Sequence, residues 1–220
     1  MQINTEYFIE YSVTACYSLY MSPQTPPDID DLRLRILDAA EQRFRGYGYT
    51  KTTMAEVADD VDMSAANLYR YFNNKQDMAA ACAQRCMSSR TDILRQLVRK
   101  KGLSASDKLR QFLMEDFRYT QNEAANQPKI VELISAVCHE RTEIVHDKIT
   151  EQCSLIGEIL AQGNASGEFD IDDVAKTARV VYSSFTLFEV PIFLPLYSVE
   201  EFETMANGLV DLLLIGLTKR

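Results

Sequence analysis

The 220-residue chain is long enough to bury a substantial core and to form one or two domains. Its formal net charge is −9, yet residues 32–101 carry 13 basic and 8 acidic side chains, whereas residues 102–220 carry 10 and 19. The acidic total therefore does not exclude binding to nucleic acid, because a phosphate backbone meets the local field of the segment that docks on it.

Cysteine usage argues against a secreted, disulfide-bonded protein, and hydropathy argues against a membrane-spanning one. The five cysteines are Cys16, Cys82, Cys86, Cys138 and Cys153. They form no CxxC pair, and an odd number without a signal peptide is typical of a reducing cytoplasm, so we expect a cytoplasmic protein without disulfides. The most apolar stretch is interrupted by Glu189, Pro191 and Pro195, which excludes a membrane span.

Residues 1–29 are predicted to be an extension outside the folded domains. The segment is aromatic, lacks a basic n-region and ends in a proline-rich link, so it does not match a secretory signal. Three interpretations remain open: disorder, a translation start at Met21 that leaves residues 1–20 outside the native protein, and a packing segment that covers an apolar patch. The side chains available for such packing are Tyr7, Phe8, Tyr11 and Leu19.

Residues 52–75 have the spacing of a helix-turn-helix. The first helix starts with a capping box, in which the Thr53 hydroxyl accepts from the Glu56 N–H and the Glu56 carboxylate accepts from the Thr53 N–H. Four apolar residues then fall on one helical face. They are Met54, Val57, Ala58 and Val61.

The connection at 59–63 is polar, and Ser64 can cap a second helix over residues 65–72. The first residues of this helix are small or polar, namely Ala65, Ala66 and Asn67. Such a helix end can approach base edges closely. This part of the sequence therefore predicts DNA reading rather than catalysis.

A longer pattern surrounds these two helices. It starts with ILDAAEQRF at residues 36–44 and continues through Gly48, Tyr49 and the Thr52-Thr53 pair. It ends with Leu68-Tyr69, Tyr71-Phe72 and Lys75. The whole stretch resembles the DNA-binding domain of the tetracycline-repressor (TetR) family of transcriptional regulators.

The resemblance implies a role for each matching position. Phosphate contacts are expected from Thr52, Thr53, Tyr69 and Lys75. The residues expected at the major groove are Ala65, Ala66, Asn67 and Arg70, behind the cap Ser64. Two positions depart from the family pattern: Asp62 replaces the turn glycine, although Asp tolerates a left-handed backbone better than most residues, and Ala66 stands where glycine is common. We expect both to affect operator affinity and preference rather than the fold.

The chain after Lys75 is predicted to be helical throughout. Helices are expected at 76–101, closed by Gly102, at 107–122, from Pro128 onward, at 142–162, at 172–188 and at 199–218. No segment shows sustained alternation of period two, so the fold class is all-α. We expect a three-helix DNA-binding domain at 30–77 and a helical ligand-binding and dimerisation domain at 78–220.

The resemblance implies that the C-terminal helices enclose a ligand pocket and that the last two pair with a second subunit. These two helices are unusually apolar, which makes at least one face of each a candidate for burial against another chain. The aromatic candidates for the pocket are Phe112, Phe117, Tyr182, Phe185 and Phe188, with ordinary core packing as the alternative. Three acidic residues on the same helices, which could neutralise a cationic ligand, are Glu115, Asp116 and Glu189.

Other functional classes have weaker support. The spacing of His139, Glu143 and His146 would stack them on one helical face, as a metal site requires. Their charged neighbours indicate a solvent-exposed surface, so no metal is expected. Cys82 and Cys86 lie four residues apart, where packing is favoured over thiol sensing. Motifs of the GxSxG, HExxH, Walker and GxGxxG types are absent, so no enzyme and no cofactor are predicted.

The predicted function is a homodimeric, ligand-responsive regulator that binds a double-stranded DNA operator, most simply a repressor that a small-molecule effector releases from a palindromic site. The alternative is a helical protein-interaction adaptor without DNA binding, in which Asp62 and the Asp59-Asp60 pair abolish DNA affinity.

Overall fold

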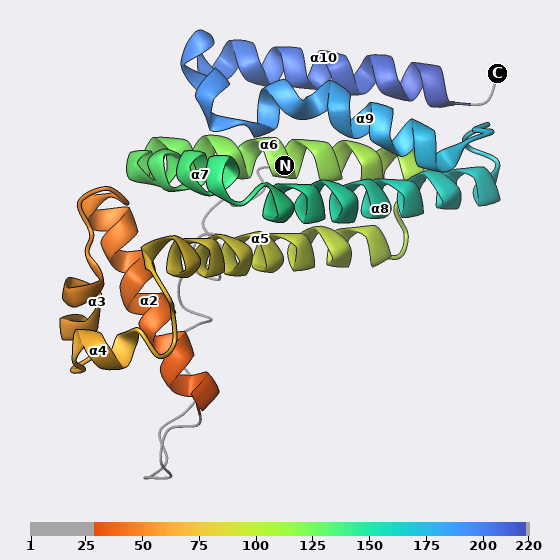
Figure 1. The fold of residues 1–220 in the computed structure, drawn as a ribbon. Coiled ribbons are helices and arrows are strands. Elements are labelled where there is room, and N and C mark those ends of the chain that lie inside the picture. Colours follow the sequence, from red (N-terminus) through yellow and green to blue (C-terminus); the bar gives the residue numbers. More distant parts are fainter. Residues whose placement is uncertain (1–28, 219–220) are drawn as a thin grey trace. The chain divides into compact units, whose positions relative to one another are not determined.

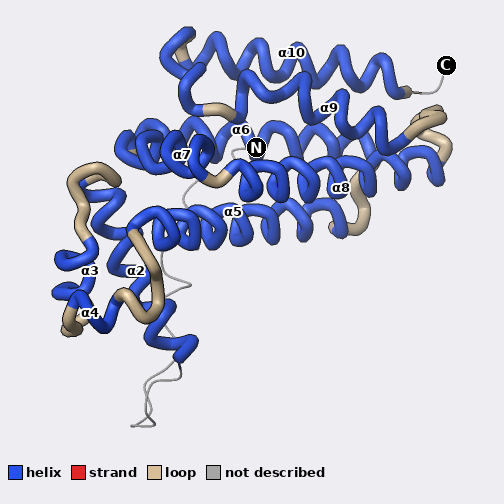
Figure 2. The backbone as a smooth tube through the Cα atoms, in the orientation of Figure 1, coloured by secondary structure: helices blue, strands red, loops and turns tan. Residues whose placement is uncertain are grey.

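The computed structural model describes residues 29–218. The predicted extension therefore lies outside the described residues except for its last position. The chain divides into residues 1–34 and residues 35–220, and the contacts reported below belong to the second unit. Every regular element among the described residues is a helix, as Figure 2 shows, which confirms the predicted fold class.

The first three helices are α2 (Ile29–Tyr47), α3 (Met54–Asp60) and α4 (Ala65–Leu68). Most apolar residues of the predicted pattern are buried; these are Ile36, Leu37, Ala40, Phe44, Met54, Val57, Ala58, Val61 and Leu68. After α2 the chain turns at Gly48, whose N–H donates to the Phe44 carbonyl at 3.1 Å. Gly48 has φ +96°, a conformation that side-chain-bearing residues rarely adopt.

The remaining helices correspond to those predicted. They are α5 (Lys75–Arg99), α6 (Ala105–Asn126), α7 (Pro128–Glu140), α8 (Thr142–Ser166), α9 (Val174–Glu189) and α10 (Val199–Leu217) (Figure 1). Polar caps begin most of them, and their side chains accept from the N–H three residues later; these caps are Asn74, Ser104, Asp173 and Ser198. A short 3-10 helix, η2 (Pro191–Leu196), was not predicted.

The C-terminal helices share one core. Helix α6 contacts α5, α7, α8, α9 and α10, and α8 packs along α9. Large side chains at the centre of this core are fully buried, among them Leu109, Phe112, Phe117, Ile156, Phe185 and Phe202. None of the described helices is both long and apolar enough to cross a membrane.

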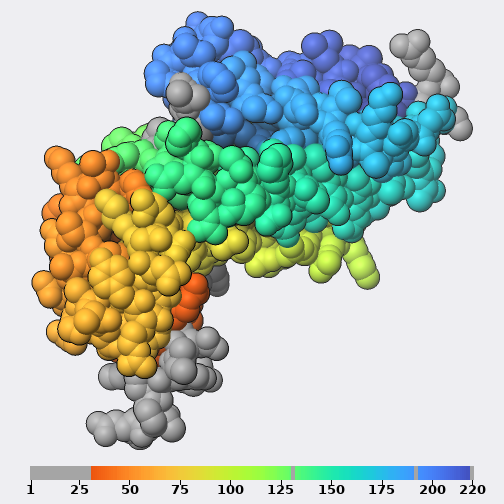
Figure 3. Space-filling model, viewed as in Figure 1, coloured from red at the N-terminus to blue at the C-terminus, as the bar shows by residue number. Residues whose placement is uncertain are grey.

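Helices α9 and α10 also present apolar side chains to solvent. Val180 on α9 is 57% exposed, and Leu212 and Ile215 on α10 are 68% and 67% exposed. In Figure 3 the blue surface at the C-terminal end of the chain belongs to these two helices. Each of the last two helices thus has exposed as well as buried apolar side chains, as expected of elements that pack against a further chain.

Candidate nucleic-acid interface and effector domain

The capping box at the start of α3 is present as predicted. The Thr53 hydroxyl accepts from the Glu56 N–H at 3.3 Å, and the Glu56 carboxylate accepts from the Thr53 N–H at 2.8 Å. Arg43 on α2 reaches both acidic ends of α3, with Nη1 at 3.6 Å from Glu56 and Nη2 donating to Asp60 at 2.8 Å. The hydrogen bond from Arg43 lowers the pKa of Asp60. The guanidinium therefore offsets part of the negative charge that α3 brings to this domain.

The turn between α3 and α4 is built around Asp62. Its φ of +56° confirms that this residue takes the left-handed conformation usually left to glycine. The Met63 N–H donates to the Ala58 carbonyl at 3.0 Å, and the Ser64 hydroxyl accepts from the Asn67 N–H at 3.2 Å. The replacement of the turn glycine by Asp62 is therefore compatible with the helix-turn-helix backbone.

Helix α4 is shorter than the predicted span of 65–72. The α-helix ends at Leu68, and the N–H groups of Arg70 and Tyr71 donate to carbonyls three residues earlier, at 3.1 and 2.9 Å. This tighter bonding is typical of a final 3-10 turn. It keeps Leu68 and Phe72 buried as the chain turns toward α5.

Several residues predicted to contact DNA are solvent-accessible. Thr53, Ser64, Ala66 and Arg70 are exposed, and Tyr69 is 51% exposed. Ala65 and Asn67 are half-buried on the same short helix. The N-terminal end of α4 is thus open to an approaching surface, and base reading by its side chains stays a prediction.

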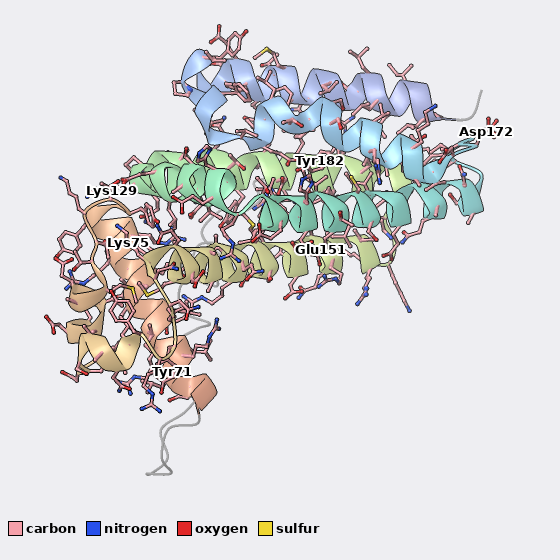
Figure 4. The ribbon with its side chains drawn as sticks, in the orientation of Figure 1. Tyr71, Lys75, Lys129, Glu151, Asp172 and Tyr182 are labelled. Carbon is pink, nitrogen blue, oxygen red and sulfur yellow. The ribbon has the colours of Figure 1, made fainter. Side chains whose placement is uncertain are left out.

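Thr52 and Lys75 occupy a different environment from the one expected. Thr52 is only 1% exposed, and its hydroxyl donates to the Gly48 carbonyl at 2.9 Å. The Lys75 ammonium, labelled in Figure 4, donates to the carbonyls of Tyr49 at 2.9 Å and Thr52 at 3.0 Å. It also lies 4.5 Å from the centroid of the Tyr49 ring. In this structure both side chains hold the turn before α3 instead of facing solvent, a role that the sequence pattern did not reveal.

Helix α7 holds the same turn from another side. The Glu132 carboxylate accepts from the Thr50 N–H at 2.6 Å and from the Thr50 hydroxyl, and these bonds lower its pKa. Lys129 donates to the Gly46 carbonyl at the end of α2 (Figure 4). Direct hydrogen bonds therefore join the C-terminal helices to the turn that leads into the helix-turn-helix.

Four of the five aromatic pocket candidates form one packed cluster. Phe112, Phe117, Phe185 and Phe188 are each at most 4% exposed. The rings of Phe185 and Phe188 are 4.9 Å apart, and Phe117 meets Phe188 edge-on at 6.1 Å. Tyr182 is half-buried beside this core. The structure brings the candidates together, and whether they contact a ligand stays a prediction.

A buried ionic cluster adjoins these rings. Asp116 on α6 is 1% exposed and accepts from Arg90 Nε of α5. Glu189 on α9 is 7% exposed, and its Oε2 lies 3.8 Å from Lys148 Nζ of α8. Burial, followed by the neighbouring Asp116 carboxylate, raises the pKa of Glu189 to about 8. Two of the three acidic candidates are thus inside the domain.

The third acidic candidate, Glu115, does not belong to this cluster. It is exposed and lies 3.6 Å from Arg118, one turn along α6. The direction of a helical side chain changes by about 100° per residue, so adjacent acids on one helix point to different environments.

The histidine pattern is broken by a helix boundary. Helix α7 ends at Glu140 and α8 begins at Thr142, with Arg141 between them at φ −133° and ψ 61°. The assumption that His139, Glu143 and His146 share one helical face is therefore wrong. Within residues 29–218 no three His, Cys, Asp or Glu side chains are placed to hold a metal ion.

The two cysteines of α5 are held as thiols. Burial, followed by the Glu41 carboxylate, raises the pKa of Cys82 to about 12 and that of Cys86 to about 11. A thiolate is the reactive form, so this environment favours packing over thiol sensing.

These features define a helix-turn-helix domain joined to a larger helical domain with an apolar and partly charged interior. Residues 36–82 match "Bacterial regulatory proteins, tetR family", and residues 105–210 match "Tetracyclin repressor-like, C-terminal domain". The chain belongs to the TetR family, and it is a DNA-binding transcriptional regulator. Regulators of this family bind DNA operators and small-molecule ligands, are dimeric, and are generally not enzymes.

Individual relatives agree with this assignment. ArpR of Pseudomonas putida, a probable HTH-type transcriptional regulator, is 23% identical over 165 residues, which cover 70% of this chain and 78% of ArpR. The SmeT complex with triclosan aligns with a TM-score of 0.62 at 18% identity, over 86% of this chain and 92% of SmeT. Bacillus subtilis FadR in complex with stearoyl-CoA aligns with a TM-score of 0.59 at 16% identity, over 84% and 98%. At these identities the solved structures establish the shared fold.

Proposed function

We propose that this regulator is a homodimeric repressor, and that a small molecule bound in the C-terminal domain releases it from a palindromic operator. The observation that carries the proposal is that Glu132 of α7 accepts hydrogen bonds from Thr50 in the turn before α3, while Lys129 of α7 donates to Gly46 at the end of α2. Through them, a rearrangement of the C-terminal helices changes the position of the DNA-reading helix. The ligands in the SmeT and FadR structures support a ligand-binding role for the corresponding domain here.

Two considerations support the dimer. A single helix-turn-helix reads few bases, and a two-fold dimer places two reading helices about 34–36 Å apart, or a multiple of that spacing, along one face of the duplex. The exposed apolar side chains of Val180, Leu212 and Ile215 on α9 and α10 offer the surface for it. Because such a contact is isologous, the same residues would be buried on both subunits.

Release is a shift of population. Effector binds better to a dimer whose reading helices are wrongly spaced, so it lowers operator affinity by the difference in binding free energy, typically ~1–3 kcal/mol or about 5–150-fold. The proposed contacts at the operator are Thr53, Tyr69 and Arg70 to phosphate or the groove, with Asn67 reading bases.

The test is selection of bound fragments from a random DNA pool at two salt concentrations, followed by mobility shift on the enriched site. We expect a palindrome, with affinity that falls steeply as salt rises. Arg70→Ala should weaken binding, whereas Arg179→Ala, an equal loss of charge at an exposed position on α9, should not. No enrichment at low salt would refute operator binding and favour the adaptor. An enriched site without two-fold symmetry would refute the dimeric mode.

A further inference from the structure

Three buried polar side chains belong to α6, α8 and α9, helices that pack against one another. Asp116 and Gln152 are each 1% exposed, and Glu189 is 7% exposed. Two of their oxygens, Glu189 Oε1 and Gln152 Oε1, have no hydrogen-bond partner among the side chains and backbone that the structure describes. Buried polar atoms without a hydrogen-bond partner are rare in folded proteins, and a bound ion or ligand is one of the explanations for them.

Helix periodicity places the Gln152 side chain on the side of α8 that faces Glu189. Gln152 follows Lys148 by one turn of α8, so both side chains leave the same face of that helix, and Lys148 is the residue next to Glu189. Tyr182 lies two turns before Glu189 on α9 (Figure 4). Burial, followed by the Glu189 and Asp116 carboxylates, raises the pKa of the Tyr182 hydroxyl, as expected of a phenol close to both acids.

The nearby cations would not fully neutralise an ionised Glu189, in keeping with its raised pKa. Arg90 is committed elsewhere, since it donates to Asp116 and to the Glu115 carbonyl and stacks 3.9 Å above the Tyr119 ring. Lys148 approaches only Oε2 of Glu189, at the long distance of 3.8 Å. The neighbouring rings of Phe185 and Phe188 provide apolar walls whose π-faces attract positive charge.

We propose that Glu189, assisted by Gln152 and Tyr182, binds the positively charged group of an apolar organic cation, which is the effector class of this regulator. The role of this cation as effector rests on the proposed function, whereas the binding of a cation at Glu189 does not. Because the carboxyl group of Glu189 holds a proton near neutral pH, binding of a cation breaks its O–H bond and releases that proton to the buffer.

Tetraphenylphosphonium and tetraphenylborate provide a matched pair of probes, since they have nearly the same shape and opposite charge. We expect tetraphenylphosphonium to raise the melting temperature of the wild-type protein and to bind in calorimetry, and tetraphenylborate to do neither. Titrations at pH 7 in two buffers with different heats of ionisation should show proton release for the wild type. Equal binding of both probes, or no binding of the cation, would overturn the proposal.

Two variants locate the site. Glu189→Gln removes the charge with little change in volume and should weaken tetraphenylphosphonium binding at least tenfold and abolish the proton release. Glu115→Gln makes the same change at an exposed position on α6 and should alter affinity less than twofold. If Glu189→Gln does not fold, Gln152→Met removes the second unpartnered oxygen and should also weaken the binding of tetraphenylphosphonium. Unchanged affinity in the folded variants would refute the assignment.

Operator affinity, measured with and without tetraphenylphosphonium, distinguishes a failure of this inference from a failure of the proposed function. If tetraphenylphosphonium binds at Glu189 but leaves operator affinity unchanged, the site stands and its role as effector site is refuted. Loss of operator affinity in the wild type but not in Glu189→Gln supports both. If the protein binds its operator but does not bind tetraphenylphosphonium, only the cation site is refuted.

Discussion

Gly48 offers a sharp test of how the turn before α3 is held. Its φ is +96°, and a Cβ at this position would lie 2.8 Å from Glu132 Oε2. Gly48→Ala therefore imposes a disfavoured backbone conformation and pushes away the carboxylate that binds Thr50. The backbone alone costs about 1–2 kcal/mol. The displaced carboxylate is near solvent, where screening limits its contribution to about 0–1 kcal/mol.

We expect Gly48→Ala to lower the free energy of unfolding by about 2 kcal/mol, or the melting temperature by about 4–8 °C for a chain of this size. Gly46→Ala is the matched control, because Gly46 lies in α2 and a Cβ there meets nothing within 4 Å. Replacing this helical glycine should stabilise the protein by about 0.5–1 kcal/mol. Urea unfolding monitored by circular dichroism measures both. If Gly48→Ala unfolded at the wild-type midpoint, the reasoning about the left-handed turn would be refuted.

Three further predictions concern the helix-turn-helix and its support. Lys75→Met removes the donor to the carbonyls of residues 49 and 52 and should destabilise the protein by about 1–3 kcal/mol in urea; wild-type stability would contradict the inward role of this lysine. Cys82 and Cys86 should react slowly with iodoacetamide at pH 7.5, at a rate that rises about tenfold per pH unit toward pH 10, since their raised pKa keeps them protonated; rapid labelling of the native protein would reopen thiol sensing. Asn67→Ala should change the preference among operators, whereas Tyr69→Phe should weaken binding to all of them alike; a uniform loss with Asn67→Ala would refute base reading.

Local sequence signals predicted the helix-turn-helix because the interactions that shape it are local. The Thr53 capping box, the Ser64 cap and the left-handed Asp62 each depend on residues within four positions. The apolar spacing likewise indicated which residues of α3 are buried. The same reasoning placed the C-terminal helices, since Pro128 and Gly102 mark a start and an end.

The roles of single charged residues could not be predicted in this way, because their partners lie far along the chain. Lys75 belongs to a family pattern of phosphate contacts, yet its ammonium binds carbonyls 23 and 26 residues earlier. Glu132 gave no signal in the sequence, and its partner Thr50 is 82 residues away. Glu115 and Asp116 are adjacent acids, and only the packing of α6 determines which of them is buried.

The buried ionic cluster and the turn before α3 are joined by one helix. Arg90, which binds Asp116, and Lys75, which holds the turn, both belong to α5, an uninterrupted helix from Lys75 to Arg99. At 1.5 Å per residue, their positions are about 22 Å apart along its axis. If a cation binds at Glu189 as proposed, it would compete with Arg90 for the neighbouring Asp116, and a weaker Arg90 contact would loosen α5 from α6. A shift of α5 as a unit would then be felt at Lys75 and the carbonyls it holds, while Glu132 keeps the turn attached to α7. The turn is thus held by two helices, and a ligand that shifts one against the other must strain it.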